Sequence, residues 1–423
     1  MASAGTVTSQ RMDLLATCDL AGRPDSLQVM LGRGHAFVTH PFTGGFSVVD
    51  VRDPTRPAPV AYVPPPAGTR TLHLQLSGDI LLVTNEADNS ASAKYLDKAQ
   101  YFGTQLGQDT AGLAAFSAGV RIYDVSVPGR PAEAGFLPIP GFGVHRLWWD
   151  GGPLATASSM PLGHDDFILS VLDMSDPLAP ALVGHWVPAL PEPDRAALNQ
   201  GGQGARVGLH HAILGGTLAY GAWRAGGLYI TDVSDGRLCP AGSLSPETWG
   251  GGNTHTTLPL PGRDLVVLAD ESVLDHQADG DRRIWLLDVA DRSAPRVIGA
   301  LPEPGRPRSA LPGSAPAGPD FRAMGGVFGP HNLHENRSGT WRSEDLIFAT
   351  YQNAGVRVYD IADPAAPQEV AFLVPPPPAA IVDPRAAGGA LVPQTADLVV
   401  STEGLVIASD LNGGLSLMQF GGG

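Results

Sequence analysis

Short stretches of alternating apolar and polar residues recur along the chain, and most end in an aspartate followed by a proline-bracketed turn. The clearest copy, residues 355–367, reads Gly-Val-Arg-Val-Tyr-Asp-Ile-Ala-Asp-Pro-Ala-Ala-Pro. Alternation with a period of two predicts a β-strand, and Asp-Pro-x-x-Pro predicts a tight turn. Further copies occupy residues 45–57, 119–131, 167–180, 227–236 and 284–295, with a degenerate last copy at 414–420. Repetition at roughly 40–50 residues, once insertions are removed, is typical of a β-propeller.

Each repeat unit can be divided into four strands. In the second unit these are predicted over residues 72–76, 80–84, 119–125 and 132–137. The seventh unit ends after its third strand, at Phe420, whereas an unassigned strand pattern occupies residues 12–19. Pairing of this N-terminal strand with residues 415–420 would hide two open sheet edges. The sequence therefore predicts an all-β fold, a seven-bladed β-propeller with four-stranded antiparallel blades. It forms a single domain over residues 1–423, and the N-terminal strand closes the ring.

Long insertions separate the predicted strands. Antiparallel order places the loop between strands two and three on the same face as the loop between consecutive units. The insertions at these places are predicted to cap one face, and the longest are residues 87–118, 188–208, 302–329 and 375–393. Residues 93–102 predict either a short helical lid that carries Tyr95, Tyr101 and Phe102 or a disordered surface loop. Long loops grouped over one face are typical of a cap over a functional site.

The composition agrees with many short strands and tight turns. Of the 423 residues, 53 are Gly and 39 are Pro, and only 16% are charged. The net charge of −15 argues against nucleic acid and anionic membranes as partners, because both attract basic patches. Cys18 and Cys239 form neither a CxxC motif nor a disulfide framework. No stretch resembles a signal peptide or a membrane span, so we expect a cytoplasmic protein that binds a small molecule; its oligomeric state stays open.

The 12 histidines follow the repeat. Five consecutive units, the second to the sixth, carry a histidine at the equivalent position where the first strand opens: His73, His145, His210, His255 and His331. His211 follows His210, and because side chains alternate along a strand, only one of the two can face the channel. The Gly-x-His spacing favours His210. First strands line the central channel of a propeller, so the five imidazoles are predicted to converge on its axis beneath the cap.

Convergent imidazoles predict a metal site. Neutral imidazole suits zinc, copper, iron and nickel, and a ring of equivalent positions can supply three or four ligands. The alternative is structural, because a repeat can also copy a histidine for packing. The metal hypothesis is favoured because the histidine persists in units that differ strongly elsewhere. We predict a transition metal ion, iron or copper in preference to zinc, with ligands drawn from His73, His145, His210 or His211, His255 and His331.

Two acidic residues and one further histidine are candidates for catalysis. Glu86 and Glu271 end the second strands of the second and fifth units, near the capped face. Each can orient a ligand imidazole or act as a general base, or it can simply begin a polar loop. His334 is the third candidate, although its spacing is not the HExxH pattern of zinc enzymes. The aspartates that end the third strands are instead predicted to form turns: Asp50, Asp124, Asp173, Asp232, Asp288 and Asp360.

The repeat Gly-Val-Arg-Val-Tyr-Asp-Ile-Ala-Asp-Pro-Ala-Ala-Pro resembles the LVIVD repeat family, which implies a β-propeller fold and leaves the function open. Its copies spread this resemblance over most of the chain. The histidines are similar in architecture to propeller metalloenzymes with axial histidines: carotenoid cleavage oxygenases, selenium-binding proteins with methanethiol oxidase activity, and nitrous oxide reductase. This similarity implies a metal on the propeller axis, but none of the sequence motifs of those enzymes is present.

A histidine site with open coordination positions suits redox-active iron or copper. We therefore predict a metal-dependent oxidoreductase or oxygenase that acts on a small, partly apolar organic substrate entering through the cap. The second hypothesis is a redox-inert zinc enzyme, a hydrolase, hydratase or lyase, with Glu86 or Glu271 as its base. The third is a non-catalytic propeller scaffold whose capped face binds a ligand or a protein.

Overall fold

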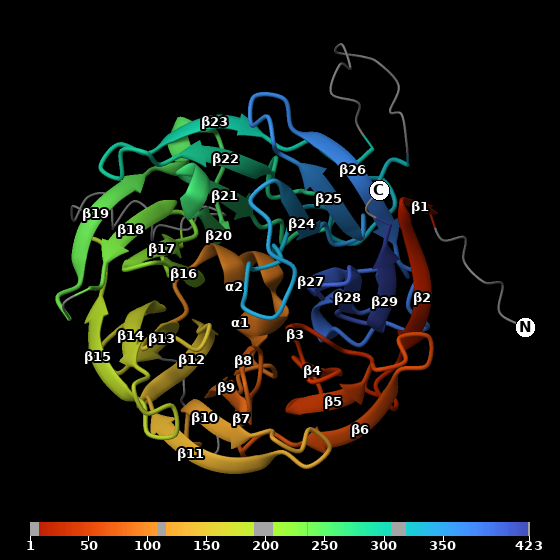
Figure 1. The fold of residues 1–423 in the computed structure, drawn as a ribbon, viewed down its shortest axis with the longest axis horizontal. Helices are drawn as coiled ribbons and strands as arrows, with labels where there is room; N and C mark the ends of the chain where they lie inside the picture. The colour runs from red at the N-terminus through yellow and green to blue at the C-terminus, as the bar shows by residue number, and fades with distance from the viewer. Residues whose placement is uncertain (1–7, 108–115, 190–205, 235, 306–318, 422–423) are drawn as a thin grey trace, which may run out of the picture.

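Short antiparallel sheets surround a common centre in the computed structural model of the chain. The structure describes residues 8–107, 116–189, 206–234, 236–305 and 319–421. Viewed down the shortest axis, the sheets radiate from the middle of the molecule to its rim (Figure 1). This arrangement is propeller-like, and it confirms the all-β prediction for the part of the chain that is described.

The first three repeat units contribute strands in the predicted order. The first sheet consists of β3 (Val29–Gly32), β4 (His35–Thr39), β5 (Phe46–Asp50) and β6 (Ala58–Val63). The second unit contains β7 (Thr69–Arg70), β8 (Leu74–Ser77), β9 (Ile80–Ala87), β10 (Gly119–Asp124) and β11 (Ala132–Pro138). The third contains β12 (Gly141–Trp148), β13 (Leu154–Pro161), β14 (Ile168–Asp173) and β15 (Ala181–Trp186). A pairing between Gly143 of β12 and Glu86 of β9 joins these two units into one sheet.

The later units follow the same pattern. The fourth contains β16 (His211–Gly215), β17 (Leu218–Ala222), β18 (Leu228–Asp232) and β19 (Cys239–Leu244). The fifth contains β20 (Thr254–Leu260), β21 (Leu265–Asp270), β22 (Ile284–Asp288) and β23 (Arg296–Ala300). The sixth contains β24 (Leu346–Thr350), β25 (Val356–Asp360) and β26 (Gln368–Val374), and the seventh contains β27 (Thr395–Val400), β28 (Leu405–Asp410) and β29 (Gly414–Phe420). Residues 331–334 run beside β24 but form only an isolated bridge there, between Leu333 and Ala349.

The N-terminal segment completes two sheets. As predicted, β2 (Met12–Cys18) pairs antiparallel with β29, with Met12 opposite Phe420 and Cys18 opposite Leu415. The sequence did not predict β1 (Thr8–Gln10), which pairs with β26 of the neighbouring sheet. Both strands lie at the rim beside the C-terminal sheets (Figure 1). Two outer sheet edges are thereby covered by the same segment, which reduces the backbone left open for edge-to-edge association.

In five of the seven units a glycine at the start of the third strand permits a close approach by the fourth strand: Gly45, Gly119, Gly227, Gly355 and Gly414. Gly355 has a φ of 77°, and a Cβ built there would lie 2.3 Å from the carbonyl oxygen of Leu373. At Gly414, with a φ of 74°, the Cβ would lie 2.1 Å from the carbonyl oxygen of Cys18. Any side chain would therefore clash, and only glycine combines this φ with this approach. The N-terminal strand thus meets β29 in the same way that β26 meets β25.

The repeat aspartates form the predicted turns. In each, the carboxylate accepts a hydrogen bond from the backbone N–H two residues later, as for Asp360 and Ala362 at 2.8 Å. The same contact occurs at Asp50, Asp124, Asp173, Asp232 and Asp288. Such Asx turns replace the backbone partners that are lost where a strand ends. These aspartates are therefore structural, as expected.

Apolar side chains between neighbouring sheets form the core. One cluster joins the sixth and seventh units, with Phe348 and Val358 packed against Met418 and with Met12 buried from the N-terminal strand. Burying one such side chain stabilises the fold by about 1.5–3 kcal/mol. The middle strand β21 is buried at every position. The core therefore lies between the sheets and leaves the innermost strand ends free to carry polar side chains.

Two short helices and a loop cover the centre of one face (Figure 1). The helices are α1 (Ala93–Leu96), capped by Ser92, and α2 (Lys98–Gly103), capped by Asp97. They confirm the helical alternative for residues 93–102. The loop between β26 and β27 contains the 3-10 turn η3 (Pro384–Ala386); η1 (Pro246–Thr248) and η2 (Pro261–Arg263) lie in the fifth unit. Residues 108–115, 190–205 and 306–318 of the predicted insertions lie outside the described residues.

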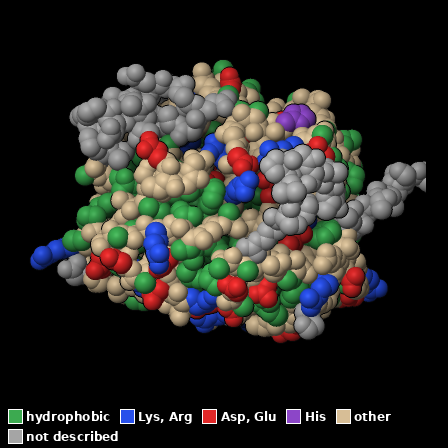
Figure 2. All heavy atoms as spheres, turned by 90° about the horizontal axis from the view of Figure 1, so that it is seen from above, with side chains coloured by type: hydrophobic (Ala, Val, Ile, Leu, Met, Phe, Trp, Pro, Cys, Tyr) green, Lys and Arg blue, Asp and Glu red, His purple; other side chains and the backbone are tan. Residues whose placement is uncertain are grey.

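The rim carries charges of both signs. Figure 2 shows acidic and basic side chains interspersed among apolar and neutral ones on the side that it presents. Pairs such as Arg263 with Asp345, at 2.8 Å, link neighbouring units at the surface. Among the described residues, no helix has the length and hydropathy needed to cross a membrane.

Candidate functional site

A cavity of about 130 Å³ lies beneath the cap at the centre of the ring of sheets. The structure brings together all five repeat-equivalent histidines in its wall: His73, His145, His210, His255 and His331. The cap contributes Tyr95, Lys98, Tyr101 and Phe102 from the helices, and Asp383 and Arg385 from the loop before β27. The cavity is therefore bounded by imidazoles on the sheet side and by aromatic and charged side chains on the cap side.

The imidazoles form one continuous group. The ring centroids of His73 and His145 are 5.0 Å apart, and those of His145 and His210 are 5.1 Å apart. His210 and His255 stack at 3.5 Å, and His255 lies 4.4 Å from His331. Residues separated by more than 250 positions in the sequence thus share one wall. The repeat alignment identified this group without any other information.

Irregular strand geometry directs these side chains toward the axis. The pairing of β12 with β13 shifts register between Val144 and Arg146, so His145 is the extra residue of a β-bulge. The pairing of β20 with β21 shifts in the same way around His255. A third shift occurs around Ala396, which occupies the equivalent position in the seventh unit. Because a bulge changes the direction of a side chain, the repeat uses it to turn this position inward.

Hydrogen bonds fix which nitrogen of most imidazoles carries the proton. The Nδ1–H of His73 donates to the carbonyl of His145 at 2.6 Å, and that of His210 donates to the carbonyl of His255 at 2.9 Å. His331 donates to the carbonyl of Ala396 at 2.5 Å. Each histidine thus donates to the bulge residue of the next unit. A carbonyl can only accept, so in these three histidines Nδ1 holds the proton and Nε2 keeps its lone pair.

The histidines of the cavity are held in the neutral form. Burial lowers the pKa of all five, and the nearby guanidinium group of Arg146 contributes to the lowering at His73, His210, His255 and His331. Imidazole must be neutral to bind a metal. The wall therefore presents unprotonated imidazoles near neutral pH.

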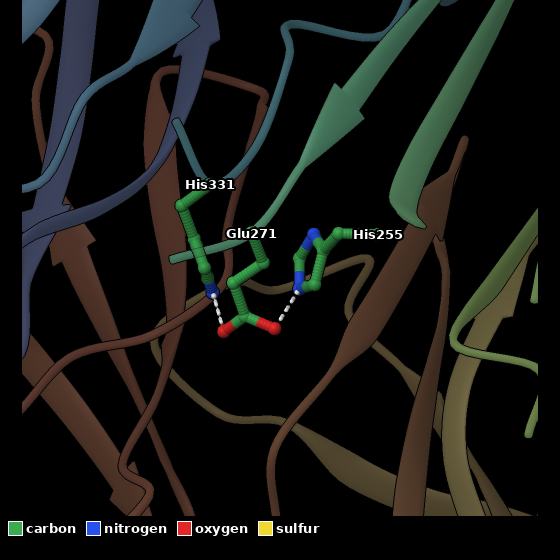
Figure 3. A group of neighbouring side chains, drawn as sticks. All are labelled: His255, Glu271 and His331. Atoms are coloured by element: carbon green, nitrogen blue, oxygen red, sulfur yellow. Dashed lines mark ion pairs between the residues drawn. The ribbon is translucent and has the colours of Figure 1, made fainter. Parts of the chain in front are cut away.

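Glu271, at the end of β21, brings a carboxylate between two of these imidazoles (Figure 3). Its Oε2 lies 3.6 Å from Nε2 of His255, and its Oε1 lies 3.5 Å from Nε2 of His331. The ligand atoms of these three residues all lie within 4.8 Å of one another. Ligand atoms held about 2.1 Å from one ion are about 3–3.4 Å apart, so the group is close to the spacing of neighbouring ligands.

The contact between His331 and Glu271 fits a cation. Because Nδ1 of His331 holds the proton, its Nε2 lone pair faces a carboxylate oxygen at 3.5 Å. Two electron-rich atoms at this distance repel one another in a buried site unless a positive charge lies between them. Two imidazoles and one carboxylate form a donor set common to iron and zinc sites. The residues present therefore fit a transition metal ion.

Glu86 lies behind the cavity wall. Its Oε2 is 3.0 Å from Nδ1 of His145, and its other oxygen bonds to Nε of Arg70 at 2.7 Å. Burial raises the pKa of Glu86, but Arg70 and His145 more than offset this effect, and the net pKa is lowered. Glu86 is therefore an ionised acceptor that orients His145, one of the roles predicted for it. It does not line the cavity.

The structure separates two predicted residues from this group. His211 points away from the cavity; Nε2 lies 3.6 Å from Glu335, and neither ring nitrogen has a hydrogen-bond partner among the described residues. This agrees with the preference for His210 that the spacing gave. His334 is also absent from the cavity wall, because its Nε2 bonds to the carbonyl of Trp341 at 2.8 Å. The structure therefore offers no contact through which His334 could act in this cavity.

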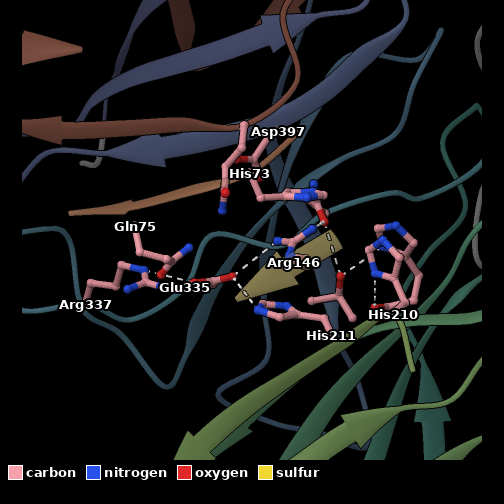
Figure 4. A network of polar contacts seen from close by, with 12 residues as sticks. His73, Gln75, Arg146, His210, His211, Glu335, Arg337 and Asp397 are labelled. Atoms are coloured by element: carbon pink, nitrogen blue, oxygen red, sulfur yellow. Dashed lines mark hydrogen bonds and ion pairs between the residues drawn. The ribbon is translucent and has the colours of Figure 1, made fainter. Parts of the chain in front are cut away.

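A buried polar network lies next to the histidines (Figure 4). At its centre, Arg146 donates to Asn332 at 2.8 Å and to Glu335 at 3.3 Å. Glu335 also pairs with Arg337. Burial raises the pKa of Asp397, at the edge of this network, to about 7. The network holds a buried cation beside the imidazoles, and this cation opposes their protonation.

Sequence reasoning missed the arginines of the cavity wall. Arg70, Arg206, Arg224 and Arg385 all line it. Arg70 and Arg206 precede His73 and His210 by three and four residues, so a repeated Arg before the repeat histidine was a signal that could have been read. Arg224 and Arg385 follow no such pattern. Arg224 lies in the loop after β17, where the sixth unit carries Gln352, and Arg385 lies in η3, so neither arginine recurs at an equivalent position.

Comparison with known proteins supports the fold class. No protein-family model matches the chain, and no curated protein sequence matches it. The chain is similar in structure to the β-propeller domain of Cps50 (Swd1) from Myceliophteria thermophila, with a TM-score of 0.53 and 11% identity over 96% of this chain and 99% of that one. The RRP9 WD40 repeats give a TM-score of 0.53 and 11% identity over 96% and 97%.

A third similar structure comes from Bacteroides uniformis and is provisionally assigned as a 6-phosphogluconolactonase. Its TM-score is 0.51, with 12% identity over 81% of this chain and 83% of that one. At such identities, the three similarities establish a propeller-like fold and nothing about activity.

Proposed function

We propose that the chain is a metal-dependent enzyme in which a closed seven-bladed β-propeller holds a transition metal ion beneath its cap. The observation that carries this proposal is the group of His255, Glu271 and His331. At His331 a lone pair faces a carboxylate oxygen, and the proton position is fixed by a backbone carbonyl. This arrangement suits an ion better than it suits direct contact.

Pairing at the N-terminus supports the closed ring. Six units supply their own outer strand, and in the seventh that place is taken by β2 beside β29. The clash that requires glycine at position 414 repeats the clash at position 355. The segment from Met12 to Cys18 thus serves as a fourth strand, which is what closure of seven four-stranded units requires.

The donor set favours redox-active iron. Two imidazoles and one carboxylate with open positions are typical of non-haem iron oxygenases, and additional imidazoles nearby also suit copper. When bound, such an ion would supply redox chemistry with O₂. We therefore favour an oxidoreductase that acts on a small, partly apolar substrate in a cavity of about 130 Å³.

The protein side chains have defined tasks in this proposal. His255, Glu271 and His331 hold the ion. Glu271 is kept in place by Arg224, whose Nη1 lies 3.4 Å from its Oε2. Tyr101 and Phe102 line the cavity from the cap. His145, held by Glu86, presents its second nitrogen to the same space and can accept a proton there.

A redox-inert zinc enzyme is the second candidate. The same donor set, two histidines and one glutamate, occurs in catalytic zinc sites. In that case the ion would act as a Lewis acid, and His210, which stacks on His255 at 3.5 Å with its Nε2 unprotonated, would be a nearer base than His145. Glu86 is a weaker candidate for this role because His145 and the buried Arg70 both occupy its carboxylate.

Elemental analysis of the purified full-length chain tests the proposal. With iron, copper and zinc supplied together during expression, we expect about one ion per chain. His255→Ala and Glu271→Gln each remove one ligand and should lower the metal content at least fivefold. His334→Gln is the matched control, because it changes a buried histidine outside the cavity and keeps a donor toward Trp341.

Thermal unfolding must show that each variant remains folded. Optical and EPR spectra under O₂ then separate iron or copper from zinc. Full metal retention in both ligand variants would contradict the proposal, as would a wild-type chain that binds none of the three metals.

A further inference from the structure

We propose that the cavity binds a small organic monocarboxylate with a body about the size of one aromatic ring, and that Arg224 receives its carboxylate. This inference concerns the substrate class of the enzyme proposed above and rests on that proposal for its catalytic meaning. Binding of the anion itself requires only side chains that the structure describes.

Most cations of the wall already have a carboxylate partner of their own. Arg206 forms a two-pronged contact with Asp166 at 2.6 and 2.7 Å, and Arg385 forms one with Asp383 at 2.9 and 3.1 Å. Arg70 pairs with Glu86, and Lys98 lies 3.4 Å from Asp275. These four cations are therefore occupied and serve mainly to position the wall.

Arg224 differs from the other four. Its Nη1 donates to Asn253 at 2.9 Å and reaches Glu271 at 3.4 Å, the distance that also separates Lys98 from Asp275, but the carboxylate of Glu271 does not belong to Arg224 alone. Glu271 is also shared with two imidazoles. A metal ion on Glu271 would engage that carboxylate further and leave the positive charge of Arg224 without a dedicated partner. A buried guanidinium in this state is costly unless something else neutralises it.

The free edge of Arg224 has the geometry that binds a carboxylate. Its side chain is only 6% exposed and lines the cavity. Among the described residues, neither Nε nor Nη2 forms a hydrogen bond, and neither is sealed off from the cavity as a fully buried atom. These two nitrogens lie on one edge of the guanidinium plane, where two parallel N–H groups can hold both oxygens of a carboxylate.

The rest of the wall suits an aromatic or similarly sized apolar body. The ring of Phe102 lies 5.7 Å from the guanidinium carbon of Arg224, and Phe167 packs beside His145 at 5.1 Å. Tyr95 and Tyr101 form an edge-to-face pair at 5.2 Å in the cap. The volume of about 130 Å³ is close to that of engineered protein cavities of about 150 Å³ that hold benzene.

One vacant guanidinium edge matches one negative charge. A monocarboxylate would neutralise Arg224, whereas a phosphate dianion would bring a second charge for which the wall has no other unpaired cation among the described residues. Arg224 and the metal group line the same cavity, so the body attached to the carboxylate would lie in the space that the metal group faces. We therefore assign a monocarboxylate rather than a phosphate ester.

Calorimetric titration of the full-length chain with benzoate and with its neutral analogue benzamide tests this assignment. Benzoate is expected to bind at least tenfold more tightly. Arg224→Met should reduce this preference to less than twofold, because it keeps the apolar stem and removes the charge. Arg296→Met is the matched control, since Arg296 pairs with Asp288 at the surface, and it should leave the preference unchanged.

A second variant of Arg224 and a phosphate ligand provide further tests. If Arg224→Met does not fold, Arg224→Lys, which keeps the charge without the two parallel donors, should weaken benzoate binding about tenfold. Three results would overturn the assignment. The wild type could bind benzoate and benzamide equally, or the preference for benzoate could survive in Arg224→Met. The third is benzoate binding that is unchanged in Arg224→Lys. Tighter binding of phenyl phosphate than of benzoate would do the same.

Glu271→Gln separates this inference from the proposed function. That variant should lose its metal and keep or strengthen benzoate binding, because Arg224 then loses its nearest acid. If benzoate binds but no sample contains metal, the result supports the anion site and contradicts the proposed metalloenzyme. If metal binds but benzoate is not preferred over benzamide, the result supports the metal site and contradicts the anion site.

Discussion

The side chain of His331 shows how single contacts decide the chemistry of the cavity. Its Nδ1–H is committed to the carbonyl of Ala396, so its lone pair faces Glu271. The sequence predicted His331 as a ligand and Glu271 as a residue that orients a ligand imidazole or acts as a base, but it did not pair these two residues or predict Glu271 as a ligand. Their proximity depends on the bulge at position 396, where the sequence carries an alanine and gives no sign of a role.

Arg224 illustrates what the sequence could not reveal at this scale. It follows the second strand of the fourth unit, and the sixth unit carries Gln352 at the equivalent place, so the arginine itself does not recur. Its importance comes from a missing partner, and the absence of a partner is a property of three-dimensional packing. The histidines were predictable because five copies shared one position; a single arginine had no such support.

Asp397 gives a prediction about pH. Burial raises its pKa from 3.8 to about 7, and this effect outweighs the backbone hydrogen bonds that its carboxyl accepts, among them one from the N–H of Val29 at 3.1 Å. The folded protein therefore keeps the proton while the unfolded chain loses it near pH 4, so this residue lowers stability as pH rises from about 4 to 7. The side chain in Asp397→Asn cannot ionise, so the variant should not lose this stability. Relative to the wild type, its free energy of unfolding should rise by at most about 4 kcal/mol over this pH range.

Thermal unfolding of the wild type and Asp397→Asn between pH 4.5 and pH 8 checks this expectation. The melting temperature of the variant, relative to the wild type, should increase steadily with pH. A difference that is constant or that shrinks over this range would show that Asp397 is ionised in the fold.

At the scale of elements, alternation and turn chemistry were sufficient for most strands. The third strands and their Asx turns lie where the repeat predicted them, and β2 pairs with β29 in the predicted place. The three residues of β1 were not predicted because they carry no alternating apolar pattern. The bulges at His145 and His255 were also hidden, since a bulge alters hydrogen-bond register without altering the apolar pattern.

Met12 tests the contribution of the N-terminal strand. Its side chain is 1% exposed and packs in the cluster that contains Phe348 and Phe420. Met12→Ala removes this packing and leaves a cavity, so it should lower the free energy of unfolding by about 2–4 kcal/mol. Urea unfolding followed by circular dichroism measures the change.

Leu182→Ala is the matched control for this experiment. Leu182 lies on the outer strand β15 and is 42% exposed, so its loss should cost less than about 1 kcal/mol. If the two variants were equally stable, the N-terminal strand would not be part of the cooperative fold.

At the scale of the whole molecule, the propeller-like arrangement places equivalent strand ends around one centre, and the cap covers that centre with residues from distant parts of the chain. The repeat allowed the face and the histidines to be predicted, because equivalent positions in a ring must converge. The cap could not be predicted in the same detail. Its loops differ in length and sequence, and contacts between them, such as that of Arg385 with Tyr95, arise only when they fold together.

Anomalous diffraction from crystals of the protein, recorded above and below the absorption edges of iron, copper and zinc, tests the central claim most directly. The account predicts one peak within bonding distance of Nε2 of His255, a carboxylate oxygen of Glu271 and Nε2 of His331. A second data set from Glu271→Gln should lack it. A peak elsewhere in the chain, or none in crystals grown with all three metals, would contradict a metal centre beneath the cap.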